Sequence, residues 1–245
     1  MSVFEGKKAF IVGGTGGIGK RIGLRLAAAG AEVTVHGSRP LSAAAEAEFS
    51  DAAAGCGKIS SIAVPFSSET FKECCAAIVP YCRTADILCV CYGPFIQKAL
   101  DDTEPADWQD MALLDYALPG FCVSTALPHM TAVHWGRILL FGGTRTQTVQ
   151  GFRTNAAYAG AKTGVCSLVK SVALQYADSG VSCNALLPGF VDTEYISAAV
   201  KRELAKKMPD GSLIPADEAA EAALFLLASG HINGALLNID KGWNP

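Results

Sequence analysis

The stretch that decides the fold is Gly13-Gly14-Thr15-Gly16-Gly17-Ile18-Gly19, in which five of seven residues are glycine. A short β-type run, Ala9–Val12, precedes it, and a segment expected to be helical, near Ile18–Ala29, follows it. Glycine permits a turn with positive φ and lets a phosphate approach the backbone, while the helix N-terminus presents free N–H groups to negative charge. The loop is therefore predicted to bind the pyrophosphate of a dinucleotide, with a merely flexible turn as the alternative.

Outward from this loop, short β-type runs alternate with longer alanine-rich segments along the whole chain. The expected strands are Ala9–Val12, Glu32–His36, Ile59–Val64, Ile87–Cys91, Arg137–Phe141, Ser182–Leu187 and Leu236–Ile239. The expected helices lie near Ile18–Ala29, Ser42–Ala54, Thr70–Tyr81, Trp108–Thr131, Ala157–Ala177, Glu194–Lys207 and Ala216–Leu227. This alternation predicts an α/β doubly wound Rossmann fold, a seven-stranded parallel sheet with helices on both faces. Ligands of such a sheet bind beyond the carboxyl ends of the strands.

Length and composition agree with a single domain over residues 1–245. Half of the 245 residues are hydrophobic, and 20 Lys and Arg against 23 Asp and Glu give a formal charge of −3. A near-neutral chain without a run of basic residues argues against nucleic acid as a partner. The four histidines are scattered without metal-ligand spacing, so no metal site is expected.

Cysteine usage and the N-terminus predict a cytoplasmic protein. The nine cysteines are odd in number and show no CxxC spacing, which is typical of buried free thiols in a reducing compartment. The N-terminus lacks the pattern of a signal peptide. The stretch Tyr116–Gly136 carries no Asp, Glu, Lys or Arg, but its prolines and histidines favour a helix buried in a soluble domain over a membrane span.

The end of the second expected strand indicates which dinucleotide is bound. An NAD site usually carries a carboxylate there, whereas this chain has His36-Gly37-Ser38-Arg39. Ser38 can donate a hydrogen bond to a 2′-phosphate, and Arg39 can offer a fork of charged donors. NADP(H) is therefore favoured over NAD(H), with an ordinary exposed arginine as the alternative reading of Arg39.

Tyr158 and Lys162 stand four residues apart at the start of a predicted helix, so that phenol and ammonium share one face. The ammonium is expected to favour phenolate and to lower the pKa of Tyr158, which suits proton exchange with a carbonyl or an alcohol. Alone the pair is a weak signal, because such pairs are common on solvated helix faces. With the glycine loop it becomes specific.

At this spacing the chain resembles the short-chain dehydrogenase/reductase family over its whole length. Further matches are Asp86-Ile87-Leu88, the segment from Asn184 to Thr193, and Ile232-Asn233-Gly234 with Gly242-Trp243. The resemblance implies that Lys162 also binds the nicotinamide ribose and that Thr193 contacts the carboxamide. Together with Ser38 and Arg39, the cofactor-binding residues predicted on this basis are Gly13, Thr15, Gly17, Ile18, Gly19, Phe66, Gly93, Tyr158, Lys162, Pro188, Gly189, Val191 and Thr193.

The chain also departs from the family pattern. Val90-Cys91-Tyr92-Gly93 replaces the usual Asn-Asn-Ala-Gly, and the aspartate that meets adenine falls on Pro65 or Phe66. The asparagine of the proton-relay tetrad falls on Asp115, and the catalytic serine falls on Gly143. Thr144, the nearest hydroxyl, is predicted to orient the substrate carbonyl instead, with an ordinary loop threonine as the alternative. The candidate catalytic residues are Tyr158, Lys162, Thr144 and Asp115.

The resemblance implies an NADPH-dependent oxidoreductase that reduces a ketone or 3-oxoacyl carbonyl of a small-molecule substrate to an alcohol. One alternative is an alcohol dehydrogenase working oxidatively, since the same groups serve both directions. Another is an NADP(H)-binding regulator or sensor without turnover, which Gly143 and Asp115 favour and the intact Tyr158–Lys162 pair opposes. An enoyl reductase usually shows a longer interval between its tyrosine and lysine.

Two expectations concern larger segments. The segment around residues 190–212 is expected to form a substrate lid, whose basic residues either attract an anionic substrate or form a solvated face. The long predicted helices Trp108–Thr131 and Ala157–Ala177 are poor in charge, and family members commonly pair these helices between subunits. A homodimer or homotetramer is therefore expected.

Overall fold

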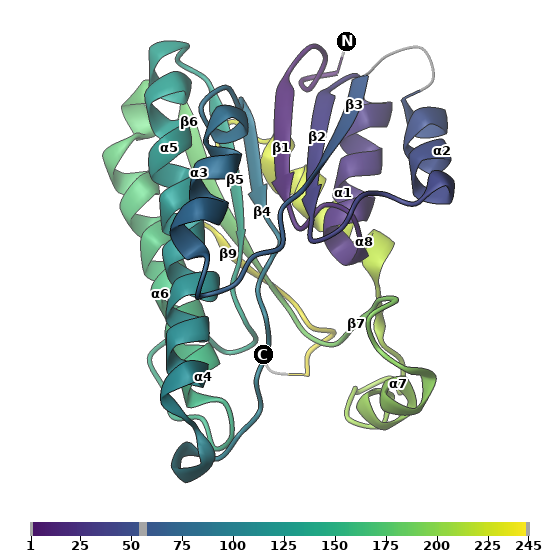
Figure 1. The fold of residues 1–245 in the computed structure, drawn as a ribbon, viewed down its shortest axis with the longest axis vertical. Coiled ribbons are helices and arrows are strands. Elements are labelled where there is room, and N and C mark those ends of the chain that lie inside the picture. The colour runs from purple at the N-terminus through teal and green to yellow at the C-terminus, as the bar shows by residue number, and fades with distance from the viewer. Residues whose placement is uncertain (1, 54–57, 244–245) are drawn as a thin grey trace.

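The fold is organised around one parallel sheet. A computed structural model describes residues 2–53 and 58–243 and has this sheet at its centre (Figure 1). Its strands are β1 (Lys8–Val12), β2 (Glu32–Gly37), β3 (Lys58–Ala63), β4 (Ile87–Val90), β5 (Gly136–Phe141), β6 (Val181–Pro188) and β9 (Leu236–Ile239). In space they follow the order β3-β2-β1-β4-β5-β6-β9, with parallel pairing throughout. The predicted doubly wound fold is confirmed, and the strand order reverses between β1 and β4, where such sheets bind ligands.

Helices cover both faces of the sheet. One face carries α1 (Gly17–Ala28), α2 (Ala43–Ala52) and α8 (Ala216–Ala228), and the other carries α3 (Phe71–Cys82), α5 (Leu118–Ala132) and α6 (Ala156–Gln175) (Figure 1). Along β5, Ile138 and Leu140 enter one apolar cluster, while Leu139 and Phe141 enter the other. Successive side chains of a strand point to opposite faces, so a continuous apolar run becomes a strand buried on both sides.

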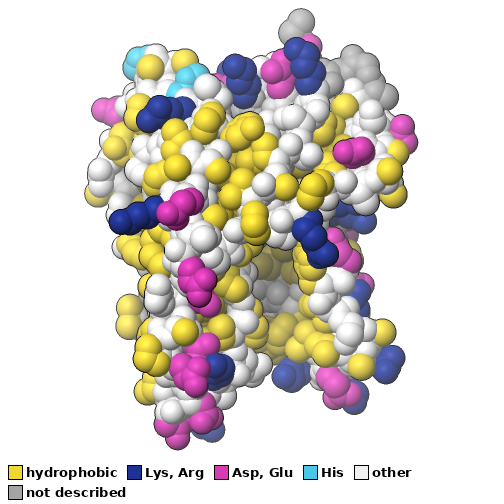
Figure 2. Space-filling model, in the orientation of Figure 1, with side chains coloured by type: hydrophobic (Ala, Val, Ile, Leu, Met, Phe, Trp, Pro, Cys, Tyr) yellow, Lys and Arg dark blue, Asp and Glu magenta, His cyan; other side chains and the backbone are white. Residues whose placement is uncertain are grey.

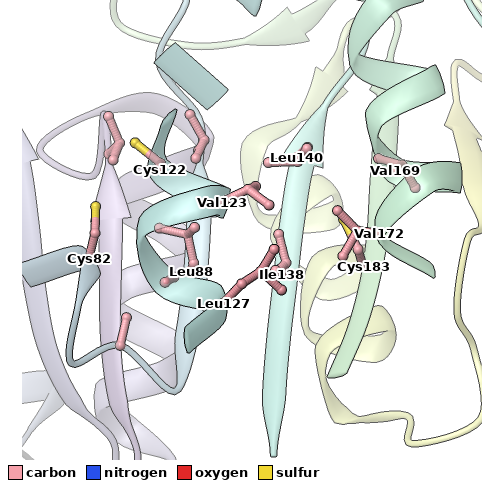
Figure 3. Packing of buried hydrophobic residues seen from close by; sticks show 14 of the residues in the cluster. Cys82, Leu88, Cys122, Val123, Leu127, Ile138, Leu140, Val169, Val172 and Cys183 are labelled. Atoms are coloured by element: carbon pink, nitrogen blue, oxygen red, sulfur yellow. The ribbon is translucent and has the colours of Figure 1, made fainter. Parts of the chain in front are cut away.

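The charge-free stretch of the sequence forms part of this core. Figure 3 shows Val123 and Leu127 of α5 close to Ile138 of β5, and all three are at most 8% exposed. The helical stretch Pro105–Ala132 is long and apolar enough to cross a membrane by length and composition, but half of its most apolar window is buried inside the fold. This is the burial expected of a core helix.

The single helix predicted over Trp108–Thr131 consists of three pieces. α4 (Pro105–Asp110) leads into a π-helical segment, η2 (Met111–Ala117), which continues into α5. Pro119 is the second residue of α5, directly after the π segment, and its missing N–H removes one hydrogen bond from this continuous helix. π turns widen a helix locally and are frequent at functional sites. Here the π turn carries Asp115.

The segment between β6 and α8 forms a separate arm. The short strands β7 (Val191–Asp192) and β8 (Ile214–Pro215) pair with each other, and between them lies α7 (Ala198–Ala205). The predicted helix Glu194–Lys207 is thus shorter, because the Ser197 hydroxyl accepts a hydrogen bond from Val200 N at 3.4 Å and starts it there. Figure 2 shows the surface hollowed between this arm and the end of the molecule that carries α4. The role of residues 190–212 as a lid stays a prediction.

The eight described cysteines are free thiols, all buried except Cys91, which is partly exposed. Cys56 and Ala54, the predicted end of a helix, lie outside the described residues. No group of three or more His, Cys, Asp or Glu side chains that could hold a metal ion occurs among residues 2–53 and 58–243.

Candidate active site

The glycine loop joins the carboxyl end of β1 to the first turn of α1 and forms one wall of a cavity. Gly13 and Gly17 have φ of +78° and +53°, a conformation that favours glycine. The cavity has a volume of about 370 Å³. Its lining includes these residues predicted to bind the cofactor: Gly13, Thr15, Gly17, Ile18, Gly19, Ser38, Gly93 and Thr193. The structure thus brings together the segments that follow β1, β2, β4 and the short strand β7.

The other predicted cofactor residues lie around this cavity rather than in its lining. Arg39 follows Ser38 and is exposed. Phe66 stacks on His36, with 4.3 Å between the ring centroids. Pro188 ends β6, and Gly189 N donates to Ile239 O at 2.9 Å. Val191 is buried in a small apolar cluster of the arm, and Tyr158 and Lys162 lie deeper, on α6.

His36 is a residue of this site that the sequence did not single out. It is fully buried at the end of β2, where Gly13 N donates to its Nδ1 at 3.2 Å and its Nε2 lies 2.9 Å from Val64 O. Because an amide donates to Nδ1, Nε2 must carry the proton that is shared with Val64. Burial lowers the pKa of His36, outweighing the opposing effect of the Val64 hydrogen bond. The neutral imidazole therefore fixes the first glycine of the loop.

Tyr158 and Lys162 lie in the first two turns of α6, and the π segment brings Asp115 to them. Lys162 Nζ lies 5.7 Å from the centre of the Tyr158 ring and 2.9 Å from Asp115 Oδ1. Asp115 is fully buried and Lys162 is 5% exposed. Gly93 provides the space, because a Cβ there would lie 2.2 Å from Asp115 Oδ1. Three of the four predicted catalytic side chains are thus together, next to a glycine that lines the cavity.

The pKa of Tyr158 is raised, whereas the sequence predicted that it is lowered. Burial of the phenol is the largest cause; the Lys162 charge opposes it, and the Asp115 charge adds to it. For Lys162, burial favours loss of the proton, but the adjacent Tyr158 and Asp115 outweigh burial, and the pKa is raised. At neutral pH the site therefore holds a protonated phenol next to an ammonium group.

Gly143 follows β5 and faces the Tyr158 hydroxyl. A Cβ at Gly143 would lie 3.4 Å from Tyr158 Oη and 3.1 Å from Tyr158 Cε1. Thr144 Oγ1 donates its proton to Pro188 O at 2.9 Å, and its role toward the substrate carbonyl stays a prediction. Thr146, which the sequence did not single out, is fully buried; its Oγ1 donates to Gly143 O at 2.7 Å and accepts from Gly143 N at 3.0 Å. These bonds fix the turn that presents Gly143 to Tyr158.

Comparisons with known proteins cover almost the whole chain. A family model described as enoyl-(acyl carrier protein) reductase matches residues 13–244. The chain is 30% identical to D-beta-hydroxybutyrate dehydrogenase of Cupriavidus necator, over 98% of this chain and 99% of that protein. It is 29% identical to 3-oxoacyl-(acyl-carrier-protein) reductase FabG of Escherichia coli, over 98% of each. The chain belongs to the short-chain dehydrogenase/reductase family.

A solved structure of this oxidoreductase family agrees with the assignment. A putative 2-deoxy-D-gluconate 3-dehydrogenase from Agrobacterium tumefaciens, crystallised with bound NADP, has a TM-score of 0.82 at 26% identity and covers 99% of this chain and 97% of its own. Gly143 lies next to Tyr158, and Asp115 pairs with Lys162, so both residues stand beside the predicted catalytic pair.

Two further residues of this short-chain dehydrogenase/reductase, from the segment after β7, contact the glycine loop. Glu194 Oε1 accepts a hydrogen bond from Gly17 N at 2.9 Å, at the N-terminus of α1. Tyr195 lines the cavity, and the Arg39 charge acts on its phenol. A helix N-terminus favours a carboxylate for the same reason that it favours a phosphate. The only sequence signal for this contact is the acid directly after Thr193.

The substrate side is bordered by apolar and internally paired groups. Phe95, which is 61% exposed, packs edge-to-face on Tyr158 with ring centroids 5.0 Å apart. Arg145 has a positive φ of 64° and donates to Gln150 Oε1 at 2.7 Å. Lys201 and Lys206 of the arm form ion pairs with carboxylates next to them in the arm. Such pairing favours a solvated face over the attraction of an anionic substrate.

Proposed function

We propose that this chain is an NADPH-dependent reductase of a ketone or a 3-oxoacyl carbonyl. The observation that carries the proposal is the half-buried Tyr158 phenol next to the Lys162 ammonium, which lies beside Gly93 in the lining of the glycine-loop cavity. A phenol that keeps its proton at neutral pH can act as a general acid. Relatives named 3-oxoacyl-(acyl-carrier-protein) reductase, from Escherichia coli and Aquifex aeolicus, support the reaction class.

The residues present fit a dinucleotide with a 2′-phosphate. The glycine-loop backbone and the N-terminus of α1 would hold the pyrophosphate, and Ser38 with Arg39 would hold the 2′-phosphate. No acid stands among residues 36–39. The structures of the Agrobacterium protein and of ElxO, which is 25% identical, both contain NADP. When bound, NADPH supplies the hydride for the carbonyl carbon.

Glu194 has a defined consequence for this binding. Its carboxylate already accepts the hydrogen bond of Gly17 N. A phosphate oxygen that binds Gly17 N therefore has to displace the Glu194 carboxylate from this N–H group.

The chain's own residues account for the proton. Tyr158 Oη donates its proton to the substrate oxygen as negative charge develops there, and the Lys162 ammonium stabilises the tyrosinate that remains. Gly143 leaves room for the substrate oxygen beside Tyr158 but offers no second side-chain donor. The Phe95 ring provides an apolar wall on the same side of Tyr158. The site thus suits a carbonyl that carries an apolar substituent.

The test is NADPH consumption across a panel of ketones and 3-oxoacyl thioesters, with Tyr158→Phe as the control. We expect at least one substrate to be reduced and Tyr158→Phe to lower its turnover by about 10²-fold or more. Binding of NADPH without reduction of any carbonyl would contradict the proposal. So would a substrate that Tyr158→Phe reduces as fast as the parent protein.

Oxidation of an alcohol is the second candidate. The likeness to D-beta-hydroxybutyrate dehydrogenase of Cupriavidus necator favours it. The same panel, offered as the corresponding alcohols with NADP⁺ and NAD⁺, distinguishes the two directions. A regulator without turnover is the remaining alternative and is favoured by Gly143. It predicts that no substrate is reduced or oxidised in either assay.

Assembly as a homodimer or homotetramer is also proposed. Trp108, Tyr116 and Leu174 are 45%, 46% and 84% exposed on the α4, η2 and α6 segments. Large apolar side chains on adjacent helices are typical of a covered surface. Light scattering at micromolar concentration checks this, and a monomer would contradict it. The cytoplasmic location stays a prediction.

A further inference from the structure

The ion pair between Asp115 and Lys162 is the feature of the site that the proposed reaction does not explain. Asp115 lies on the π segment with no exposed surface, and its Oδ1 is 2.9 Å from Lys162 Nζ. Its Oδ2 has no hydrogen-bond partner among the described residues. An asparagine would occupy nearly the same volume and offer an uncharged oxygen to the lysine. What the aspartate adds is a negative charge.

Few other ionisable groups act on the pair. Two of these groups lie on the loop after β4. The Cys91 thiol affects the pKa of Lys162, and the Asp115 charge affects the pKa of the Tyr92 phenol. Burial raises the pKa of both groups, so both are neutral at pH 7. On α6, Tyr158 and the Cys166 thiol both respond to the Lys162 charge, and burial raises the pKa of the thiol, so it is neutral at pH 7. Burial raises the pKa of Asp115, and the adjacent Lys162 ammonium opposes that rise. With Asp115 ionised in its 2.9 Å ion pair, the charges next to Tyr158 are Lys162⁺ and Asp115⁻.

The protonation of a phenol such as Tyr158 depends on whether a lone ammonium or an ion pair lies beside it. A lone ammonium near a phenol stabilises the phenolate and draws the proton away. With a carboxylate 2.9 Å from that ammonium, the two charges largely cancel at the phenol. Burial then determines the protonation state of Tyr158, and burial favours the uncharged phenol. The Asp115 charge acts on Tyr158 in this same direction.

We propose that Asp115 is a positioning residue that keeps Tyr158 protonated by neutralising Lys162, and so extends the pH range over which this site delivers a proton to a carbonyl. The inference rests on the proposed function for its consequence, but the protonation of Tyr158 is a property of the chain alone. By microscopic reversibility, oxidation of an alcohol by the same site begins only at higher pH.

The direct test is an ultraviolet titration of the cofactor-free protein that follows tyrosinate absorbance. The contribution of Tyr158 is isolated by subtracting the titration of Tyr158→Phe, made in the parent and in Asp115→Asn. We expect Asp115→Asn to lower the titration midpoint of Tyr158 by about one to two pH units, the size expected for removing a charge several ångströms away. If the parent unfolds before Tyr158 titrates, the variant still shows tyrosinate at a pH where the parent shows none.

The matched control is Asp110→Asn, which removes a carboxylate five positions earlier on the same helical stretch. Asp110 forms no ion pair with Lys162 among the described residues. Asp110→Asn should leave the midpoint of Tyr158 in place. If Asp115→Asn does not fold, Asp115→Ala removes the same charge and should shift the midpoint in the same direction. An unchanged or raised midpoint in a folded Asp115 variant overturns the proposal.

The kinetic counterpart is the pH profile of kcat for the best carbonyl substrate. Reduction requires the phenol, so kcat falls as pH rises through the pKa of Tyr158, and in Asp115→Asn this fall should begin at lower pH. A purely structural role of Asp115 would lower kcat at every pH without moving the profile. If the titration shifts but no carbonyl is reduced, the charge inference stands and the proposed function fails.

Discussion

The two ends of the active site have diverged from their family to different degrees. At the cofactor end, the glycine loop keeps the sequence pattern by which the chain resembles the family, and Gly13 and Gly17 have positive φ, while Phe66 and Tyr92 depart from that pattern. At the proton-delivery end, Gly143 and Asp115 stand where the family has serine and asparagine, around an unchanged Tyr158–Lys162 pair. One sheet positions both ends, at the carboxyl side of neighbouring strands.

This difference indicates that the backbone binds the cofactor phosphates while the side chains deliver the proton. Phosphate binding depends on backbone N–H groups and on the absence of side chains, so it tolerates few changes. Proton delivery depends on charges and hydroxyl groups around Tyr158, which can change while the backbone stays. The two ends should therefore respond independently to mutation.

The largest effect is expected at the glycine loop. A Cβ at Gly19 would lie 2.3 Å from Gly13 O, a backbone atom that cannot move without reshaping the loop. Gly19→Ala should weaken NADPH binding by about 10²-fold or more, equivalent to about 2.7 kcal/mol, in a fluorescence titration. Gly120→Ala, where a Cβ meets nothing within 4 Å, is the control and should bind NADPH normally. Normal affinity in Gly19→Ala would break the contrast between the two ends.

The second effect concerns the choice of cofactor. If Arg39 binds the 2′-phosphate, Arg39→Ala removes a charge-assisted hydrogen bond worth roughly 1.5–3 kcal/mol. NADPH should then bind about tenfold more weakly or worse, while NADH affinity stays nearly the same. Titrations of both nucleotides into both proteins supply the internal control. Equal affinities of the parent for NADPH and NADH would contradict the assignment.

A smaller effect is expected at Gly143. Gly143→Ser adds a hydroxyl near Tyr158 Oη, but its Cβ lies only 3.1 Å from Tyr158 Cε1, so the ring has to give by a few tenths of an ångström. We expect turnover to rise by about fivefold, less than the roughly 10²-fold worth of an aligned donor. Gly143→Ala, which adds the same Cβ without the hydroxyl, should show no increase in turnover. Equal turnover in both variants would mean that the site does not lack a donor.

The smallest effect is a pH dependence at the cofactor end. Because the pKa of His36 is lowered in the folded chain, the unfolded chain takes up a proton first as pH falls below about 6.5. The free energy of unfolding should therefore be level above this pH and decrease below it, no more steeply than about 1.4 kcal/mol per pH unit for one group. Denaturant titrations at several pH values measure this. His36→Gln should flatten the acid slope, and the exposed His231→Gln should retain it.

Much of the fold follows from the sequence, because strand and helix periodicities alternate regularly and the glycine loop fixes the order of the first elements. The seven strands and the helices on both faces of the sheet are confirmed. The π segment was not predictable from periodicity, because the following helix is apolar on nearly all sides, so the extra residue of a π turn leaves no visible break in the pattern. The arm was predicted as one helix, although Ser197 starts α7 later.

The candidate site was predicted in its residues more than in its chemistry. The expectation that Gly143 and Asp115 stand at tetrad positions came from the resemblance to the family. The hydrogen bond of Thr144 to Pro188 and the contacts of His36 and Glu194 could not be predicted, because they join segments far apart in the chain. The direction of the Tyr158 pKa was wrong because burial and a third charge, rather than the adjacent lysine, decide it. The balance of these effects on the pKa of Tyr158 depends on three-dimensional distances, which the sequence does not give.

The central claim is that cofactor binding and proton delivery are separable functions of one site. The most direct measurement compares NADPH affinity and single-turnover carbonyl reduction in the parent protein and in Tyr158→Phe. The account predicts that Tyr158→Phe binds NADPH within about twofold of the parent, while its single-turnover rate falls by about 10²-fold or more. Affinity and rate that fall together, or a rate that does not fall, would contradict it.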